Sequence, residues 1–153
     1  MALSYCVQQI LQHRQRVFQY LYRLVQKEEA ADQLAMEVFR RTCRSGLAAA
    51  APARLELALL RCATNLAFQW MRQNAETDTQ RPSPAGVRRA VAALPAKERA
   101  AVLMHKYERL TCSEIATVMA CRESAVKVLL VRAYEELRAE LVNSDAAVCV
   151  MQL

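Results

Sequence analysis

One interruption in an otherwise helical pattern constrains the fold of this chain most strongly. Residues 74–86, NAETDTQRPSPAG, hold two of the four prolines and one of the two glycines and show no apolar periodicity. On either side, residues 1–73 and 87–141 are rich in helix formers, with apolar residues three and four positions apart. Polar residues and prolines without periodicity are typical of a linker. The sequence therefore predicts an all-α fold of two small helical domains, 1–73 and 87–141, joined by a flexible linker and followed by a tail (142–153).

The first domain contains three stretches with helical spacing. The apolar stripe of the first consists of Leu3, Val7, Ile10, Leu11, Val17, Phe18, Leu21, Tyr22 and Val25. The second, residues 27–44, has acidic residues near its start and arginines near its end, which suits the helix dipole. Its core side is expected to hold Leu34, Val38, and Thr42 or Cys43. A break at 45–53, SGLAAAAPA, separates it from the third stretch (54–73), where Trp70 is expected in the core with the other apolar residues.

The third stretch also has a polar side. Asn65, Gln69 and Arg72 recur at i, i+4 and i+7, and Arg61 lies one turn earlier. Asparagine and glutamine can pair with base edges, while arginine holds phosphate. This face therefore suits contact with a nucleic acid, although a plain solvated surface has the same pattern.

Residues 110–132, LTCSEIATVMACRESAVKVLLVR, have the pattern of a helix-turn-helix. Thr111 and Glu114 form a T-x-x-E capping box before IATVM, and a turn is predicted near Ala120 and Cys121. In such a motif the second helix enters the major groove, and its early residues face base edges. The residues placed to contact DNA are Arg122, Glu123, Ser124, Ala125, Lys127, Val128 and Arg132.

The second helix of this motif is unusually apolar. Its core positions at helical spacing are Val126, Leu130, Ala133 and Leu137. That leaves Val128, Leu129 and Val131 as surplus aliphatic residues. Aliphatic side chains can touch thymine methyls, but an exposed cluster more often marks a contact with protein.

Charge and cysteine usage restrict the class of protein. The net charge is +6 and the pI about 9.2, which suits a nucleic acid or an anionic partner. No apolar run of about 18 residues is present and the start resembles no signal peptide, so we expect no membrane and a cytoplasmic location. None of the six cysteines has CxxC spacing, and His105, Cys112 and Cys121 match no zinc motif, which predicts reduced thiols and neither metal nor cofactor. His13 and His105 stand apart from any nucleophile, so no enzyme is predicted.

Three stretches together resemble RNA polymerase sigma factors of the sigma-70 family, in the small, two-domain extracytoplasmic-function type. AADQLAMEVFRR (30–41) resembles the acidic helix with a QEVF-like core. LLRCATNLAFQWMRQ (59–73) is similar to the family's YRIARNLALDHLRR. LPAKERAAVLMHKYERLTCSEIATVMACRESAVKVLLVRAYEELR (94–138) resembles the helix-turn-helix region of the family. The three occur in the family's order, with a linker in the expected place.

The resemblance implies a role in transcription initiation. The first domain, sigma region 2, would bind the clamp of core RNA polymerase and melt and read the −10 element, with Arg61, Asn65, Gln69 and Arg72 on the DNA. Polymerase contacts would fall on Asp32, Glu37, Arg40 and Arg41. The second domain, sigma region 4, would lie on the polymerase flap and read the −35 element of promoter DNA. A sigma factor itself catalyses no reaction.

The chain departs from the family pattern in places that leave an alternative open. Val128, Leu129 and Val131 stand where the family commonly has polar or basic residues, and Arg109 and Ala120 replace two usual glycines, which is expected to alter the turns. The loop at 45–54 offers no aromatic side chain for a flipped base. The alternative is a sigma-like interaction module whose apolar recognition helix and tail bind a protein partner, an anti-sigma factor or a recruiting factor, with DNA reading weakened or lost.

Overall fold

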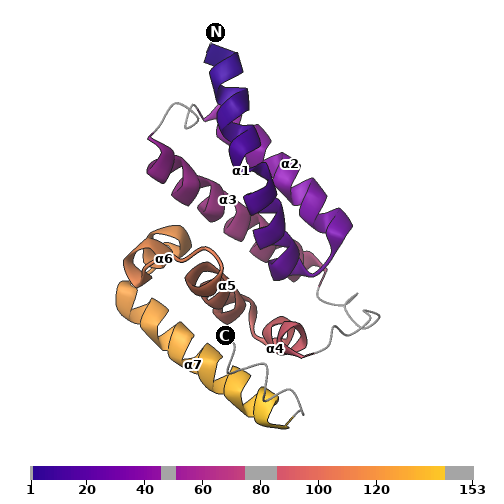
Figure 1. The fold of residues 1–153 in the computed structure, drawn as a ribbon, viewed down its shortest axis with the longest axis vertical. Helices are drawn as coiled ribbons and strands as arrows, with labels where there is room; N and C mark the ends of the chain where they lie inside the picture. Colours follow the sequence, from indigo (N-terminus) through magenta and orange to yellow (C-terminus); the bar gives the residue numbers. More distant parts are fainter. Residues whose placement is uncertain (1, 46–50, 75–85, 144–153) are drawn as a thin grey trace. The chain divides into compact units, whose positions relative to one another are not determined.

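The structure is a computed structural model that describes residues 2–45, 51–74 and 86–143. Within these ranges it contains seven α-helices and no strand (Figure 1), which confirms the predicted all-α fold. The helices are α1 (Ala2–Val25), α2 (Glu28–Arg44), α3 (Pro52–Gln73), α4 (Val87–Ala93), α5 (Ala96–Lys106), α6 (Cys112–Met119) and α7 (Glu123–Asn143).

The chain divides into two compact units. The first unit contains Met1–Gln73. The second unit contains Asn74–Ala116 and Cys121–Leu153. Most of the predicted linker and nearly all of the predicted tail lie outside the described residues, so both of these segments stay predictions.

The first unit is a bundle in which α1, α2 and α3 each pack against the other two. Its fully buried side chains include Tyr20, Leu21, Leu24, Leu55 and Leu59. A buried hydrogen bond of 2.6 Å joins the Tyr20 hydroxyl to Thr64 Oγ1. Because the Thr64 hydroxyl donates its own proton to the carbonyl of Leu60 at 2.7 Å, Tyr20 is the donor in this pair. Both polar groups are thereby satisfied inside an otherwise apolar core.

Several residues expected in the core of this unit are not fully buried. Val7 and Leu11, expected in the stripe of α1, are 48% and 56% exposed. On α2 the core position is Thr42, while Cys43 is exposed and Leu34 is half-buried. A helical stripe drawn from one helix alone overestimates burial, because the neighbouring helices cover only part of its width and length.

The second unit is built around α7, which packs against α5 and α4. Val126, Leu130, Ala133 and Leu137 are buried, as their spacing predicts. The Arg99 side chain caps the C-terminus of the short helix α4. Its Nη2 donates to the carbonyls of Ala92 (2.8 Å) and Leu94 (3.0 Å). These carbonyls belong to the group that a helix C-terminus leaves without intrahelical partners.

Two local features fix the helix-turn-helix. The capping box is confirmed: Thr111 N donates to Glu114 Oε1, and Glu114 N donates to Thr111 Oγ1, both at 3.1 Å. After α6, Ala120 has φ 52°, and Cys121 N donates back to the carbonyl of Ala116 at 3.1 Å, as in a Schellman turn.

Arg109, between α5 and α6, has φ 54°. The left-handed backbone that glycine favours is therefore present at both positions where the family has glycine, although neither residue here is glycine.

Candidate nucleic-acid and protein interfaces

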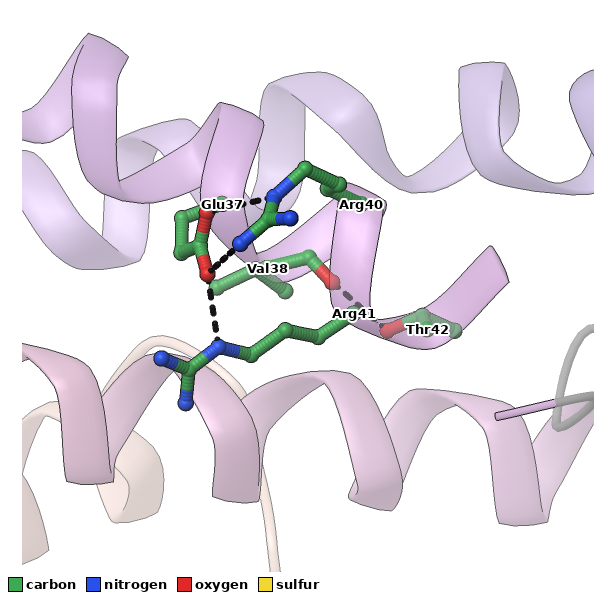
Figure 2. Close-up of polar contacts among 5 residues, drawn as sticks. All are labelled: Glu37, Val38, Arg40, Arg41 and Thr42. Carbon is green, nitrogen blue, oxygen red and sulfur yellow. Dashed lines mark hydrogen bonds and ion pairs between the residues drawn. The ribbon is translucent and has the colours of Figure 1, made fainter. Parts of the chain in front are cut away.

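Three of the predicted polymerase-binding residues form one ion-pair cluster on α2. Glu37 accepts hydrogen bonds from Arg40 Nε (2.8 Å) and Nη2 (2.6 Å) and from Arg41 Nε (2.7 Å), as Figure 2 shows. The hydrogen bonds from Arg40 and then Arg41 lower the pKa of Glu37 to about 2. The carboxylate is therefore charged at neutral pH, and the cluster presents two guanidinium groups held in fixed orientations.

Asp32, the fourth predicted polymerase-binding residue, lies in a different place. It lines an open groove of about 910 Å³ between α1 and α2. Glu37 follows Asp32 by five positions, which is about 140° around an α-helix. The structure thus brings Glu37, Arg40 and Arg41 together but separates them from Asp32.

The groove between α1 and α2, called here the α1–α2 groove, is largely apolar. Its apolar lining residues are Ile10, Leu11, Phe18, Ala35, Met36 and Phe39. Met36 is 73% exposed and Leu11 is 56% exposed. Arg14 on α1 and Glu28 and Asp32 on α2 supply charge beside them. An exposed apolar groove with charged residues beside it has the character of a site for an amphipathic helix of a partner.

The polar face predicted on α3 is present. Arg61, Asn65, Gln69 and Arg72 are all exposed, while Leu59, Ala63 and Leu66 on the other side of the helix are buried.

Two residues near this face differ from a simple core position. Trp70, expected in the core, is only half-buried. Cys62 is half-buried as well, and burial raises the pKa of its thiol, so the reactive thiolate form is disfavoured. Residues 46–50 of the preceding loop lie outside the described residues.

The residues assigned to the −35 contact are all accessible. Arg122 directly precedes α7, and the other six occupy its first ten positions; all seven are exposed. Lys127 Nζ lies 3.7 Å from Glu123 Oε1, in an i,i+4 ion pair. Val128 and Val131 are 50% and 57% exposed, whereas Leu129 is half-buried. Val128 and Val131 are thus open to solvent on α7, the helix that would enter the major groove of DNA.

Neither a metal-binding cluster nor a membrane-spanning helix is found among the described residues. Within them, no group of three or more histidine, cysteine, aspartate or glutamate side chains gathers around a point that could hold a metal. Cys43, Cys62, Cys112 and Cys121 are free thiols. None of the described helices is long and apolar enough to cross a membrane.

Comparison with known proteins defines the class. Residues 85–137 match the family model for sigma-70 region 4. The co-crystal structure of the sigma factor RpoE with the anti-sigma factor NepR from Bartonella quintana contains a chain of similar fold, with a TM-score of 0.72 and 19% identity, and the match covers 90% of this chain and 96% of that chain. No curated protein matches this sequence.

Residues 85–137 thus form a domain of the sigma-70 region 4 kind, and the all-α fold of the chain is similar to that of a sigma factor. These findings confirm the predicted resemblance of the second unit to sigma-70 region 4, and over the rest of the chain they show a likeness of fold.

Proposed function

We propose that this protein binds core RNA polymerase and directs promoter-specific initiation of transcription by recognising −10 and −35 elements. The observation that carries the proposal is the helix-turn-helix of α6 and α7, which exposes all seven candidate DNA contacts. The sigma-70 region 4 match covers α6 and α7 as far as residue 137. Because core polymerase works in the cytoplasm, the proposal places the protein there.

The −35 element would be read by the start of α7. Arg122 can donate two hydrogen bonds to guanine, and Glu123 can accept one from cytosine. Lys127 can reach guanine or a phosphate once its pair with Glu123 opens. Arg132, five residues beyond Lys127, suits the DNA backbone, and Val128 can contact a thymine methyl.

The −10 element would be held by the polar face of α3. Melted promoter DNA needs polar groups for the flipped bases and cations for the strand. Asn65 and Gln69 supply the first, and Arg61 and Arg72 supply the second. The half-buried Trp70 directly follows Gln69 on the same helix and adds an aromatic side chain on which a base can stack.

Core polymerase would bind through α1 and α2, and its flap would contact the second domain. The α1–α2 groove offers an apolar surface that includes Met36, with Asp32 beside it. The cluster of Glu37, Arg40 and Arg41 offers a second, charged surface on another side of α2. We propose that the groove supplies most of the affinity and that the exposed ion pairs supply orientation, because exposed pairs contribute little free energy.

Run-off transcription tests the proposed function. Core polymerase with the full chain would be supplied with DNA fragments from upstream of genes in the source genome. The expected result is discrete transcripts that depend on this protein and on the −35 region of the template. Failure to form a stable complex with core polymerase contradicts the proposal.

A second candidate function is favoured by one observation, the exposure of Val128 and Val131 on α7. In this candidate the chain is a sigma-like interaction module whose apolar helix binds a protein, such as an anti-sigma factor, and whose DNA reading is weak. Replacing Val128 and Val131 by serine distinguishes the two. DNA binding that is unchanged or improved, together with loss of a protein partner, favours the interaction module.

A further inference from the structure

A small pocket lies inside the second unit, where α4, α5 and α7 meet. It has a volume of about 190 Å³, and its apolar walls come from Val87 and Val91 of α4, Val102 of α5, and Leu137 and Leu141 of α7. None of the residues that line it belongs to the candidate DNA contacts. The function proposed above therefore assigns nothing to this pocket.

The size of the pocket and the burial of its walls restrict what it can hold. Val91, Val102, Leu137 and Leu141 are only 1% to 8% exposed, so the apolar surface belongs to the interior of the unit. A cavity of about 150 Å³ in a protein interior is large enough to bind benzene. The pocket therefore suits a single ring or a short chain of about six to eight carbons and is too small for a helix of a partner.

An ordered aromatic ring forms part of the wall. The hydroxyl of Tyr134 and Nδ1 of His105 are joined by a hydrogen bond of 2.8 Å. Lys106 Nζ lies 5.7 Å from the centre of the same ring, a cation–π distance. Burial raises the pKa of Tyr134, so its hydroxyl stays protonated at neutral pH. The ring thus adds an apolar surface held in one orientation and no negative charge.

The charged residues of the lining are both cations. They are Lys106 and Arg138, which are exposed, and the described residues that line the pocket include no carboxylate. Arg138 follows Tyr134 by four positions on α7, so the two side chains lie on the same side of this helix. Lys106 lies beside the same ring from α5. Two cations beside an apolar pocket favour a ligand that is apolar at one end and anionic at the other.

We propose that this pocket binds a small carboxylate whose apolar body has about six to eight carbons. The apolar body would lie against Val91, Val102 and Leu137, and the carboxylate would face Lys106 and Arg138. A guanidinium group pairs with a carboxylate through two parallel hydrogen bonds, which fixes the orientation of the ligand. A neutral hydrocarbon would fill the pocket without using the cations, and a small anion such as acetate would leave most of the apolar wall uncovered.

Two-dimensional ¹H–¹⁵N NMR of the full chain tests the proposal. The probes are octanoate and 3-phenylpropionate, and octylamine is the charge-reversed match to octanoate. We expect a carboxylate probe to shift the amide signals of Val91, Val102 and Leu141 saturably, with a Kd of about 1 mM or tighter. Octylamine should bind at least about tenfold more weakly, because its ammonium group meets like charge at Lys106 and Arg138.

Arg138→Gln should weaken binding of the carboxylate by about tenfold, because it removes a charge-assisted pair of hydrogen bonds. Arg89→Gln is the matched control: it makes the same change in net charge at an exposed position of α4 that does not line the pocket. It should leave the affinity unchanged, and thermal unfolding should show that both variants are folded.

Four results overturn the proposal. They are no binding of either carboxylate, equal binding of octanoate and octylamine, equal weakening by Arg138→Gln and Arg89→Gln, and shifts centred on Met36 in the α1–α2 groove. The inference does not rest on the proposed function, since this assay contains neither polymerase nor promoter.

Discussion

The helices α3 and α7 both expose polar side chains suited to nucleic acid, but they divide polar from apolar residues differently. On α3, Arg61, Asn65, Gln69 and Arg72 form an exposed face, and none of its large apolar residues is exposed. On α7, exposed Val128 and Val131 stand among exposed polar residues. The functional surface of α3 is therefore polar, whereas that of α7 combines polar and aliphatic side chains.

This difference bears on function. A uniformly polar face suits one class of ligand, a solvated nucleic-acid strand, where each contact is a hydrogen bond or an ion pair. A mixed face suits DNA and protein in turn, because exposed aliphatic residues gain most from contact with protein. The account therefore predicts that changes on α3 affect DNA alone, while changes on α7 alter two kinds of binding in opposite directions.

The largest expected effect lies on α3. Replacing Asn65, Gln69 and Arg72 together by alanine removes three contacts of about 1 kcal/mol each, which corresponds to a loss of about a hundredfold in promoter opening. Permanganate reactivity of the −10 region in the complex with core polymerase measures the effect. Alanine at the exposed Gln12 and Gln19 of α1 is the matched control and should leave opening intact. Equal losses in the two variants would remove any special role for the α3 face.

On α7, two substitutions are expected to change the affinity for duplex DNA by smaller factors and in opposite directions. Lys127→Ala should weaken binding to duplex DNA by about tenfold and reduce the salt slope by about one. Val128→Lys should tighten the same binding several-fold, because it adds a cation where an aliphatic residue now stands. Anisotropy titrations at several salt concentrations provide the measurement. If Val128→Lys weakens DNA binding, Val128 itself contacts DNA. The proposed difference between the DNA-binding surfaces of α3 and α7 would then be wrong.

The third prediction concerns the buried carboxyl group of Glu98 in the second unit and its effect on the free energy of unfolding. Glu98 on α5 is 7% exposed, and its Oε2 has no hydrogen-bond partner among the described residues. Burial, and then the nearby Glu136, raises the pKa of Glu98, while Arg132 opposes the shift. Because the pKa of Glu98 is raised in the folded state, its protonated form contributes to the stability of the fold. That contribution is fully present below the ordinary pKa of glutamate and is lost as the pH rises through the raised pKa of Glu98.

Glu98→Gln is therefore expected to stabilise the protein more at pH 8 than at pH 4. The gain at pH 8 should be about 1–3 kcal/mol, the usual cost of leaving a buried polar group unsatisfied. Urea unfolding at the two pH values measures it, and Glu140→Gln, at an exposed position of α7, is the control. A gain that does not depend on pH would show that the charge of Glu98 is not what costs stability.

A fourth effect is expected in the turn after α6. Ala120→Gly should stabilise the protein by about 1 kcal/mol, because it removes the steric cost of a Cβ in a left-handed backbone and outweighs the added freedom of the unfolded chain. Denaturant unfolding is the measurement. Ala125→Gly, at an exposed position within α7, should destabilise instead, since glycine is unfavourable in a helix. Destabilisation by both changes would contradict the strain assigned to Ala120.

The smallest effect concerns Glu37 of the first unit, whose shift is opposite to that of Glu98. Its hydrogen bonds to Arg40 and Arg41 lower its pKa to about 2. The stabilising contribution is therefore present above the ordinary value of 4.5 and is lost as pH falls toward 2. Glu37→Gln should lower stability slightly at pH 6 and not at pH 2. Thermal unfolding across this range would contradict the account if the two proteins differed most at the acid end.

Features decided by neighbours in the chain could be predicted from the sequence. The capping box of Thr111 and Glu114 needs only three residues of separation, and the buried positions of α7 follow from its helical period. The exposed polar residues of α3 are predictable for the same reason. The sigma-70 resemblance is strongest in residues 94–138, where the family match also falls.

Features decided by packing between helices could not be predicted in the same way. Asp32 and Glu37 look like one acidic helix surface in the sequence, yet they face different sides of α2. Met36 and Leu11 were missed as groove residues, because their exposure depends on how α1 and α2 meet. The one available signal was Met36, an apolar residue where the family has glutamine. The burial of Glu98 had no sequence signal, since glutamate in the first turn of a helix is ordinarily solvated.

Binding to core RNA polymerase tests the central claim most directly. Affinity would be measured for the full chain, for Met36→Asp in the α1–α2 groove, and for Val142→Asp as the matched control, both residues being more than 70% exposed. The account predicts tight binding by the unaltered chain and by Val142→Asp, and a loss of about tenfold or more for Met36→Asp, because a carboxylate is then placed against an apolar surface. Absence of binding by the unaltered chain, or equal affinities for all three proteins, would contradict it.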